Sequence, residues 1–228
     1  MREALAVFLC LAACEGPRRA NDSGIPEIEV APAPDVGVER RRPPPPPEFV
    51  DVAEAVPGAV LEVRYATAGN FTGAPLPGYA PGVLWLHEDT ARALADVQAA
   101  VQRDGMRLRI YDAYRPARAS EAMVDWAREQ GRLDLVTGGY VGRRSNHARG
   151  NTVDLTLDGP DGRPLDMGTD WDAFSPASHY RGVRGDAMRN RTTLRRAMQR
   201  AGFVPYAREW WHFSLPSAGP RLDVPYPK

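Results

Sequence analysis

The pattern of apolar and polar residues along the chain predicts where helices and strands lie. Four stretches have the alternation or the β-branched content of strands: residues 60–65 (VLEVRY), 107–112 (RLRIYD), 153–157 (VDLTL) and 210–215. Apolar residues recur at helical spacing in residues 88–104, 118–131 and 192–201, and a glycine closes the last two of these helices. Residues 66–82 are rich in Gly, Pro and Asn and predict a loop.

These elements mix helices and strands without a regular βαβ period. We therefore predict an α+β fold, in which helices flank a central, mainly antiparallel sheet. Residues 48–228 are about the right length for one domain with its own core. No internal repeat is present in the sequence.

The N-terminal region has a different composition. Residues 4–13 (ALAVFLCLAA) form an apolar run that is too short to span a bilayer but fits the core of a signal peptide. LAAC at residues 11–14 resembles the lipobox of bacterial lipoproteins, which predicts a signal peptide over residues 1–13 and a lipid on Cys14. A plain secretory signal, or an over-extended start with a chance cysteine, is the alternative.

Residues 14–47 contain few large apolar side chains and end in five consecutive prolines. Such a segment cannot bury enough surface to offset its chain entropy, so we predict a disordered, Pro-rich tether. A Pro-rich ligand for a partner protein is a less favoured interpretation.

Charge and cysteine content exclude several classes of function. The 29 basic and 29 acidic residues of the 228-residue chain balance, which gives no electrostatic reason to expect a nucleic-acid partner. Both cysteines, Cys10 and Cys14, lie near the N-terminus. A disulfide framework and a Cys-based zinc site are therefore excluded from the folded domain, and any metal there must be held by His and carboxylate.

Two of the four histidines have settings that suit a metal. His147 lies in SNHARGNTVD, which ends at Asp154, and His212 lies in EWWHF. These three residues could supply the ligands of a catalytic metal, and Gly150 could let the intervening loop fold back toward it. Glu209 is close enough to His212 in sequence to act as general base. Spacing alone leaves open that these are ordinary structural histidines.

Several separate sequence blocks of this chain match one protein family in the same order, which is far more specific evidence for a resemblance than one short motif. The motif SxHxxGxxxD followed by EWWH resembles the zinc signature of the D-Ala-D-Ala metallopeptidases, and more narrowly that of the VanX-type D-alanyl-D-alanine dipeptidases. The resemblance extends to YATAGNFTG (65–73), YDAYRP (111–116), MGTDWD (167–172) and LRRAMQRAGF (194–203). It does not reach the first fifty residues.

The resemblance implies one Zn²⁺ per chain in a cleft, with ligands His147, Asp154 and His212 and with Glu209 as general base. It also implies that Arg115 stabilises the transition state, that Asp172 binds the free amino group of the substrate, and that Ser145 and Tyr65 contact the bound dipeptide. From the residues alone, Arg115 could be a structural ion-pair partner and Asp172 a turn cap.

The function that follows is zinc-dependent hydrolysis of D-alanyl-D-alanine. A dipeptidase needs a carboxylate, such as Asp172, to bind the ammonium group of its substrate. An enzyme that acts on polymer ends does not need one. A zinc D,D-carboxypeptidase acting on peptidoglycan stems is one alternative, and a non-catalytic peptidoglycan-binding domain is another. The signal-like N-terminus predicts an exported protein, membrane-anchored or periplasmic, that meets the dipeptide during wall turnover and touches the membrane only through Cys14. The sequence leaves the oligomeric state open.

Overall fold

The computed structural model describes residues 44–216 and 219–227. The predicted signal peptide, Cys14 and most of the predicted tether lie outside this range. At its C-terminal end, the predicted tether meets the folded domain, because the Phe49 N–H donates to the carbonyl oxygen of Pro46 at 3.0 Å.

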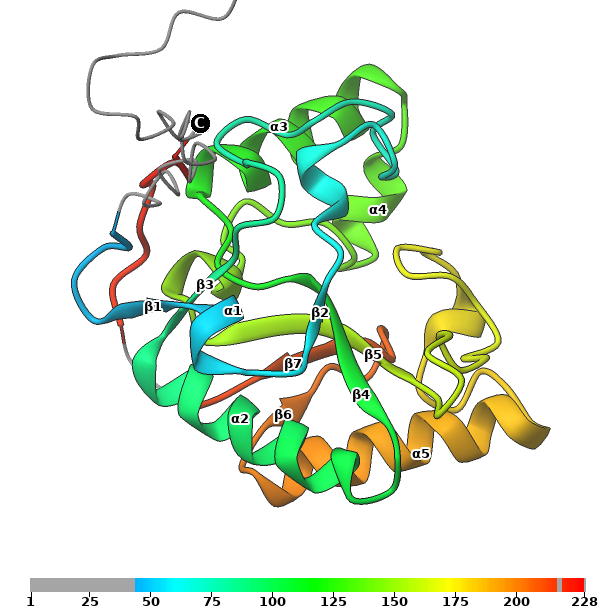
Figure 1. The fold of residues 1–228 in the computed structure, drawn as a ribbon. Helices are drawn as coiled ribbons and strands as arrows, with labels where there is room; N and C mark the ends of the chain where they lie inside the picture. The colour runs from blue at the N-terminus through cyan, green and yellow to red at the C-terminus, as the bar shows by residue number, and fades with distance from the viewer. Residues whose placement is uncertain (1–43, 217–218, 228) are drawn as a thin grey trace, which may run out of the picture. The chain divides into compact units, whose positions relative to one another are not determined.

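Two sheets and five α-helices organise the described residues (Figure 1). The strands are β1 (Phe49–Asp51), β2 (Val60–Leu61), β3 (Trp85–His87), β4 (Arg107–Asp112), β5 (Thr152–Asp158), β6 (Val204–Pro205) and β7 (His212–Ser214). The α-helices are α1 (Val52–Ala55), α2 (Glu88–Gln102), α3 (Ala117–Glu129), α4 (Leu133–Thr137) and α5 (Gly185–Arg200), and the 3-10 turns are η1 (Arg64–Ala66), η2 (Asn146–Arg149) and η3 (Pro176–Ser178).

The main sheet has the strand order β2-β4-β5-β7-β6. Only the β2–β4 pair is parallel, and every other pair in it is antiparallel. A second, two-stranded sheet pairs β1 with β3 antiparallel. The predicted α+β fold with a mainly antiparallel sheet is confirmed.

Strand β5 is central to the main sheet and is buried along its whole length. Its side chains alternate between faces, so Val153, Leu155 and Leu157 share one face while Asp154 and Thr156 point to the other. Helices α2 and α5 lie along the same side of the sheet (Figure 1) and contribute buried apolar side chains such as Leu94 and Leu194. The opposite face is therefore the one that can hold polar chemistry.

The predicted elements match the structure best where their periodicity is strongest. Strand β4 has the predicted bounds, β5 and α3 differ by one or two residues at each end, and α2 starts where expected. The last strand, β7, is shorter than predicted, and β1, β3, β6, α1 and α4 were not predicted. Most of these additional elements are short, and their apolar runs are too brief to show a period.

Two predicted elements are wrong in extent, for a physical reason in each case. In VLEVRY only Val60 and Leu61 pair with β4, and the chain then turns into η1. The alternation there reflects burial of Val63 and Tyr65 by tertiary packing, not strand pairing. Helix α5 begins at Gly185, seven residues before the predicted start. The prediction missed these residues because Arg191 fills one of the inward positions, so the first turns of the helix do not look amphipathic in the sequence.

Candidate metal centre

Three neighbouring strands place acidic and imidazole side chains in one row across the sheet. Asp154 of β5 is directly opposite His212 of β7 on one side and Asp112 of β4 on the other. A register shift between Ile110 and Asp112 marks a β-bulge in β4. Without this extra residue Asp112 would face α2 and α5, so the bulge turns its carboxylate to the polar face, as bulges beside functional sites commonly do.

His147 reaches the same point from the turn η2. Its Nδ1 donates to the carbonyl oxygen of Ala113 at 2.6 Å, and its Nε2 is directed at Asp154 and His212 of the row. Gly150 ends this turn with φ 68°, and a Cβ there would clash with the ring of Phe49. Glycine is therefore required for the chain to pass from η2 into β5, as the sequence suggested.

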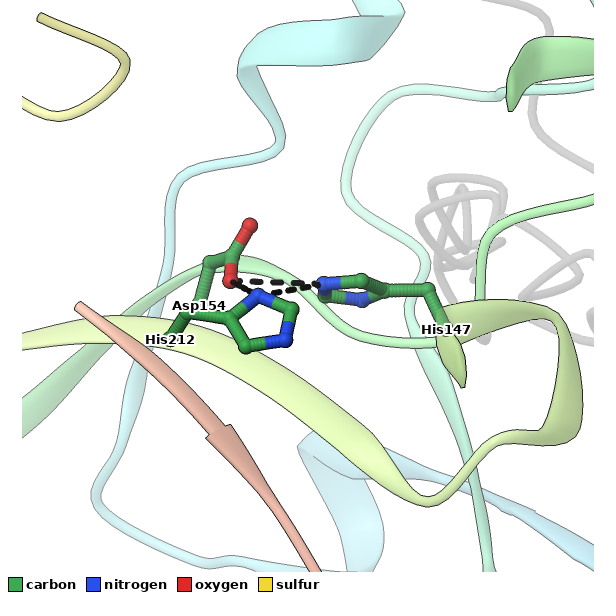
Figure 2. Close-up of side chains that lie close together, drawn as sticks. All are labelled: His147, Asp154 and His212. Atoms are coloured by element: carbon green, nitrogen blue, oxygen red, sulfur yellow. Dashed lines mark hydrogen bonds and ion pairs between the residues drawn. The ribbon is translucent and has the colours of Figure 1, made fainter. Parts of the chain in front are cut away.

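The three predicted ligands converge on one point (Figure 2). Asp154 Oδ1 lies 2.9 Å from His212 Nδ1 and 3.3 Å from His147 Nε2, and the two imidazole nitrogens are 3.4 Å apart. A tetrahedral ion with bonds of about 2.0–2.1 Å separates its ligand atoms by about 3.3 Å. The donor set therefore fits a single zinc ion.

The protonation of these ligands also suits a metal. Burial alone would raise the pKa of Asp154, but the rings of His147 and His212 outweigh this and hold it well below the usual range, so the carboxylate is ionised. Burial lowers the pKa of His212, which favours the neutral imidazole that metals bind. Among the described residues, this is the group of His, Cys and acidic side chains close enough to hold an ion.

Glu209 lies beside the predicted ligands, with Oε2 3.6 Å from Nδ1 of His212. The residue is 6% exposed. Burial, and then the charges of Asp154 and Asp172, raise its pKa well above the usual value. A carboxylate with a raised pKa is a stronger base, which is the property required of a group that accepts a proton near neutral pH.

Arg115 is held by Asp112, a residue that the sequence analysis did not single out. Asp112 Oδ2 lies 2.7 Å from Nη2 and accepts a hydrogen bond from Nε of Arg115 at 2.9 Å. The same guanidinium lies 3.6 Å from Oδ2 of Asp154 and stacks over the ring of Tyr65. The structural ion pair and a position at the metal centre thus coexist. The feature of the sequence that could have drawn attention to Asp112 is its place in the YDAYRP block, three residues before Arg115.

Asp172 and Tyr65, which are 107 positions apart in sequence, are in contact next to Arg115. The Tyr65 hydroxyl donates to Oδ2 of Asp172 at 2.8 Å. Burial, followed by the charge of Asp172, raises the pKa of Tyr65 well above its usual value, so the phenol keeps its proton. Asp172 has φ 59°, a conformation that is uncommon outside glycine, and it lines the same pocket as Asp154 and His212.

The remaining predicted contact, Ser145, begins η2, and its Oγ accepts a hydrogen bond from the His147 N–H at 3.3 Å. Ser145 therefore has a structural role next to a ligand as well as a position in the pocket. His179, outside the metal pattern, is within hydrogen-bond distance of the Tyr140 hydroxyl at 2.9 Å.

The predicted site residues other than His147 line one pocket with a volume of about 240 Å³. It is bounded by Tyr65, Phe71, Arg115, Met123, Gly139, Tyr140, Val141, Gly142, Arg144, Ser145, Asn146, Asp154, Asp172, Phe174, Tyr206, Glu209 and His212. Sites for drug-sized ligands span about 300–1,000 Å³, so this pocket suits a smaller molecule. An open metal centre with an adjacent buried carboxylate and a fixed guanidinium is the site of a mononuclear metallohydrolase.

Comparison with known proteins identifies the family. A family model described as D-Ala-D-Ala dipeptidase, Peptidase M15, matches residues 46–228. The D-alanyl-D-alanine dipeptidase of Escherichia coli is 39% identical over 173 residues, covering 75% of this chain and 86% of that protein. Its counterpart in Enterococcus faecalis is 34% identical over 195 residues, covering 78% and 94%. This chain belongs to the Peptidase M15 D-Ala-D-Ala dipeptidase family, and the predictions of a zinc metallopeptidase and of its fold are confirmed.

A more distant likeness exists to a solved structure titled as the vancomycin resistance D,D-dipeptidase VanXYg with a D-Ala-D-Ala phosphinate analogue. It superposes with a TM-score of 0.39 at 20% identity, over 78% of this chain and 67% of that one.

Proposed function

We propose that this protein hydrolyses the free dipeptide D-alanyl-D-alanine to D-alanine in a zinc-dependent reaction. The observation that carries the proposal is the convergence of His147, Asp154 and His212 on one point, beside a small pocket that Glu209, Arg115 and Asp172 line. The relatives that cover most of this chain are named as enzymes of this activity.

Each residue has a role that its position supports. Zinc, when bound, acts as a Lewis acid that polarises a carbonyl and makes water acidic near neutral pH. Glu209 accepts the proton of the attacking water and returns it to the leaving amine. Arg115, fixed by Asp112, donates to the carbonyl oxygen as negative charge develops on it.

Recognition of the dipeptide depends on its charged amino end. Asp172 is oriented by Tyr65 and faces the pocket, so its carboxylate can pair with the substrate ammonium. Burial is the largest cause of its raised pKa, followed by the charge of Asp154. A bound ammonium compensates this buried negative charge, and a substrate without a free amino group leaves it uncompensated.

The zinc D,D-carboxypeptidase is the second candidate, since it needs the same metal chemistry. The test is to incubate the zinc-loaded full chain with D-Ala-D-Ala and, separately, with a stem pentapeptide that ends in D-Ala-D-Ala. We expect rapid release of D-alanine from the dipeptide and little from the pentapeptide. Efficient release of the terminal D-alanine from the pentapeptide would overturn the dipeptidase assignment in favour of the carboxypeptidase.

A non-catalytic, peptidoglycan-binding domain is the third candidate. Such a domain needs neither a buried general base nor a fixed guanidinium, and this chain has both Glu209 and Arg115 beside the metal ligands. Absence of hydrolysis of either substrate by the zinc-loaded protein, together with binding to peptidoglycan, would favour it.

The setting that we propose is the outer side of the cytoplasmic membrane or the periplasm, in peptidoglycan turnover. The support comes from the apolar run at residues 4–13, from Cys14 in its lipobox-like context and from the Pro-rich segment that follows. Within the described residues, no helix has the length and apolar character needed to cross a bilayer. The attachment to the membrane that we propose is a lipid on Cys14, and an exported enzyme there meets dipeptide released from the wall.

A further inference from the structure

Arg191 of helix α5 is a buried cation that is not among the groups assigned to the site. It is 1% exposed, and its guanidinium donates to uncharged oxygens. Nε donates to the carbonyl of Met167 at 2.7 Å, and Nη1 donates to those of Ala177 at 2.9 Å and His179 at 2.7 Å. Nη2 lies 3.4 Å from Oγ1 of Thr169.

All four acceptors belong to one segment, residues 167–179, and they lie at its two ends. This segment carries Asp172 and Phe174, which line the substrate pocket. It has little regular structure of its own, since only the short turn η3 lies within it. One guanidinium therefore joins both ends of a loop that projects the ammonium-binding carboxylate, an arrangement typical of compact functional loops.

The same loop is tied to the segment that carries the general base. Trp210 follows Glu209, and its indole Nε1 donates to Thr169 Oγ1 at 2.9 Å. The backbone N–H of Trp210 donates to the carbonyl of Ser178 at 3.0 Å. The Arg191 guanidinium lies 5.7 Å from the centre of the Trp210 ring. A shift of Arg191 would thus reach both Asp172 and the chain next to Glu209.

Burying a charged guanidinium costs more free energy than burying an apolar side chain. Burial lowers the pKa of Arg191 to about 10, so it remains charged at neutral pH without forming an ion pair among the described residues. An apolar side chain of similar length could pack under α5 at lower cost. What it could not do is satisfy backbone carbonyls at both ends of the loop, for which the rigid fork of donors in arginine is suited.

We propose that Arg191 is a positioning residue for substrate recognition: it closes the loop of residues 167–179 and thereby holds Asp172 against Tyr65 in the pocket. The proposal rests on the proposed dipeptidase function for its kinetic consequence. Its structural consequence, a rigid loop, can be measured without any assay of activity.

The experiment compares the zinc-loaded full chain with Arg191→Met, Arg191→Lys and the control Arg189→Met. Arg189 lies on the same helix, and its side chain is 73% exposed. We expect faster amide hydrogen exchange in residues 167–179 of both Arg191 variants, with exchange in β5 unchanged and zinc content retained. The catalytic efficiency for D-Ala-D-Ala should fall by about 10²-fold, mostly through a higher KM, because small misplacements of a binding group have effects of this size. Arg189→Met should match the wild type.

An additional variant, Arg191→Ala, leaves a site that free guanidinium can enter. Millimolar guanidinium, but not the same concentration of sodium, should slow exchange in the loop and lower KM toward the wild-type value. Wild-type exchange and KM in a folded, zinc-loaded Arg191→Met protein would overturn the proposal. If Arg191→Met does not fold, Arg191→Lys decides by the same two measurements. A wild-type protein that hydrolyses no dipeptide would overturn the proposed function, while the exchange measurements would still test the role of Arg191 in the loop.

Discussion

Asp112 Oδ2 lies 2.7 Å from Nη2 of Arg115, and the two residues of this ion pair are three positions apart in the sequence, at the end of β4. Asp112 is fully buried, and its Oδ1 accepts hydrogen bonds from the hydroxyl of Tyr79 at 2.6 Å and from the backbone N–H of Ala113 at 2.9 Å. The β-bulge that turns Asp112 to the polar face therefore also sets the direction of the Arg115 guanidinium.

Replacing this carboxylate should weaken catalysis without removing the metal. In Asp112→Asn the nearer of the two carboxylate partners of Arg115 loses its charge, and we expect the catalytic efficiency for D-Ala-D-Ala to fall by about tenfold to 10²-fold with zinc content unchanged. Steady-state kinetics and metal analysis measure both. Tyr79→Phe is the matched control, since it removes a neighbour of Asp112 but leaves the ion pair. Equal losses in the two variants would contradict the role given to Asp112.

Glu209 should be separable from the metal ligands. Glu209→Gln keeps the size of the side chain but cannot accept a proton, so we expect kcat to fall by about 10²–10⁴-fold. Zinc bound per chain, measured by atomic emission, should stay at the wild-type value. A variant with near wild-type kcat would show that another group is the general base.

Loss of one imidazole should release the metal. His212→Ala removes one of three ligands, and we expect the purified protein to contain little zinc and to melt at a lower temperature than the wild type. Chelation of the wild-type protein should lower its Tm in the same direction, and added zinc should restore it. His87→Ala, a histidine that begins α2 away from the site, should retain zinc and serves as the control. Full zinc content in His212→Ala would contradict the ligand assignment.

We expect Asp172 to lower the stability of the folded protein while it improves binding of the substrate. Its pKa is raised in the folded protein, so the folded state loses stability as pH rises from the unfolded value of about 3.9 through the folded one. Asp172→Asn removes that loss, and asparagine tolerates the positive φ of this position. We expect a higher Tm for the metal-free variant at neutral pH, a difference that shrinks toward pH 4, and a higher KM for D-Ala-D-Ala.

Thermal melts across this pH range and steady-state kinetics test the two halves of that prediction. Asp170→Asn changes an exposed neighbour and should alter neither the melting temperature nor KM. A lower Tm for metal-free Asp172→Asn at neutral pH would show that its carboxylate stabilises the folded state instead.

The N-terminal cysteines provide a test of the proposed anchor. Cys14→Ala should move the protein from the membrane fraction to the soluble fraction, whereas Cys10→Ala should leave it in the membrane. The intact mass of the mature wild-type protein should begin at Cys14 and include a lipid. A mature chain that lacks the lipid, or a cytoplasmic location, would contradict this setting.

Much of this protein is determined by local sequence. The strand RLRIYD and the helix that starts at Glu88 have periodicities strong enough to be placed correctly, and apolar residues alternate in β5 as a central strand requires. The sequence also predicts which residues bind the metal, and the structure brings those three side chains together. Without cysteine in the domain, only His and carboxylate can bind zinc, and His147, Asp154 and His212 are set in recognisable motifs.

The tertiary structure decided what local patterns do not encode. The bulge that brings Asp112 beside Asp154, and the contact of Tyr65 with Asp172, depend on strand register and on closure of long loops. The start of α5 was not predicted because Arg191, a cation at an inward position, breaks the amphipathic pattern. Its partners, which are carbonyls of a distant loop, cannot be read from the helix sequence. Periodicity records which face of an element is buried, whereas these contacts are set by how separate elements pack together, and no single element determines that.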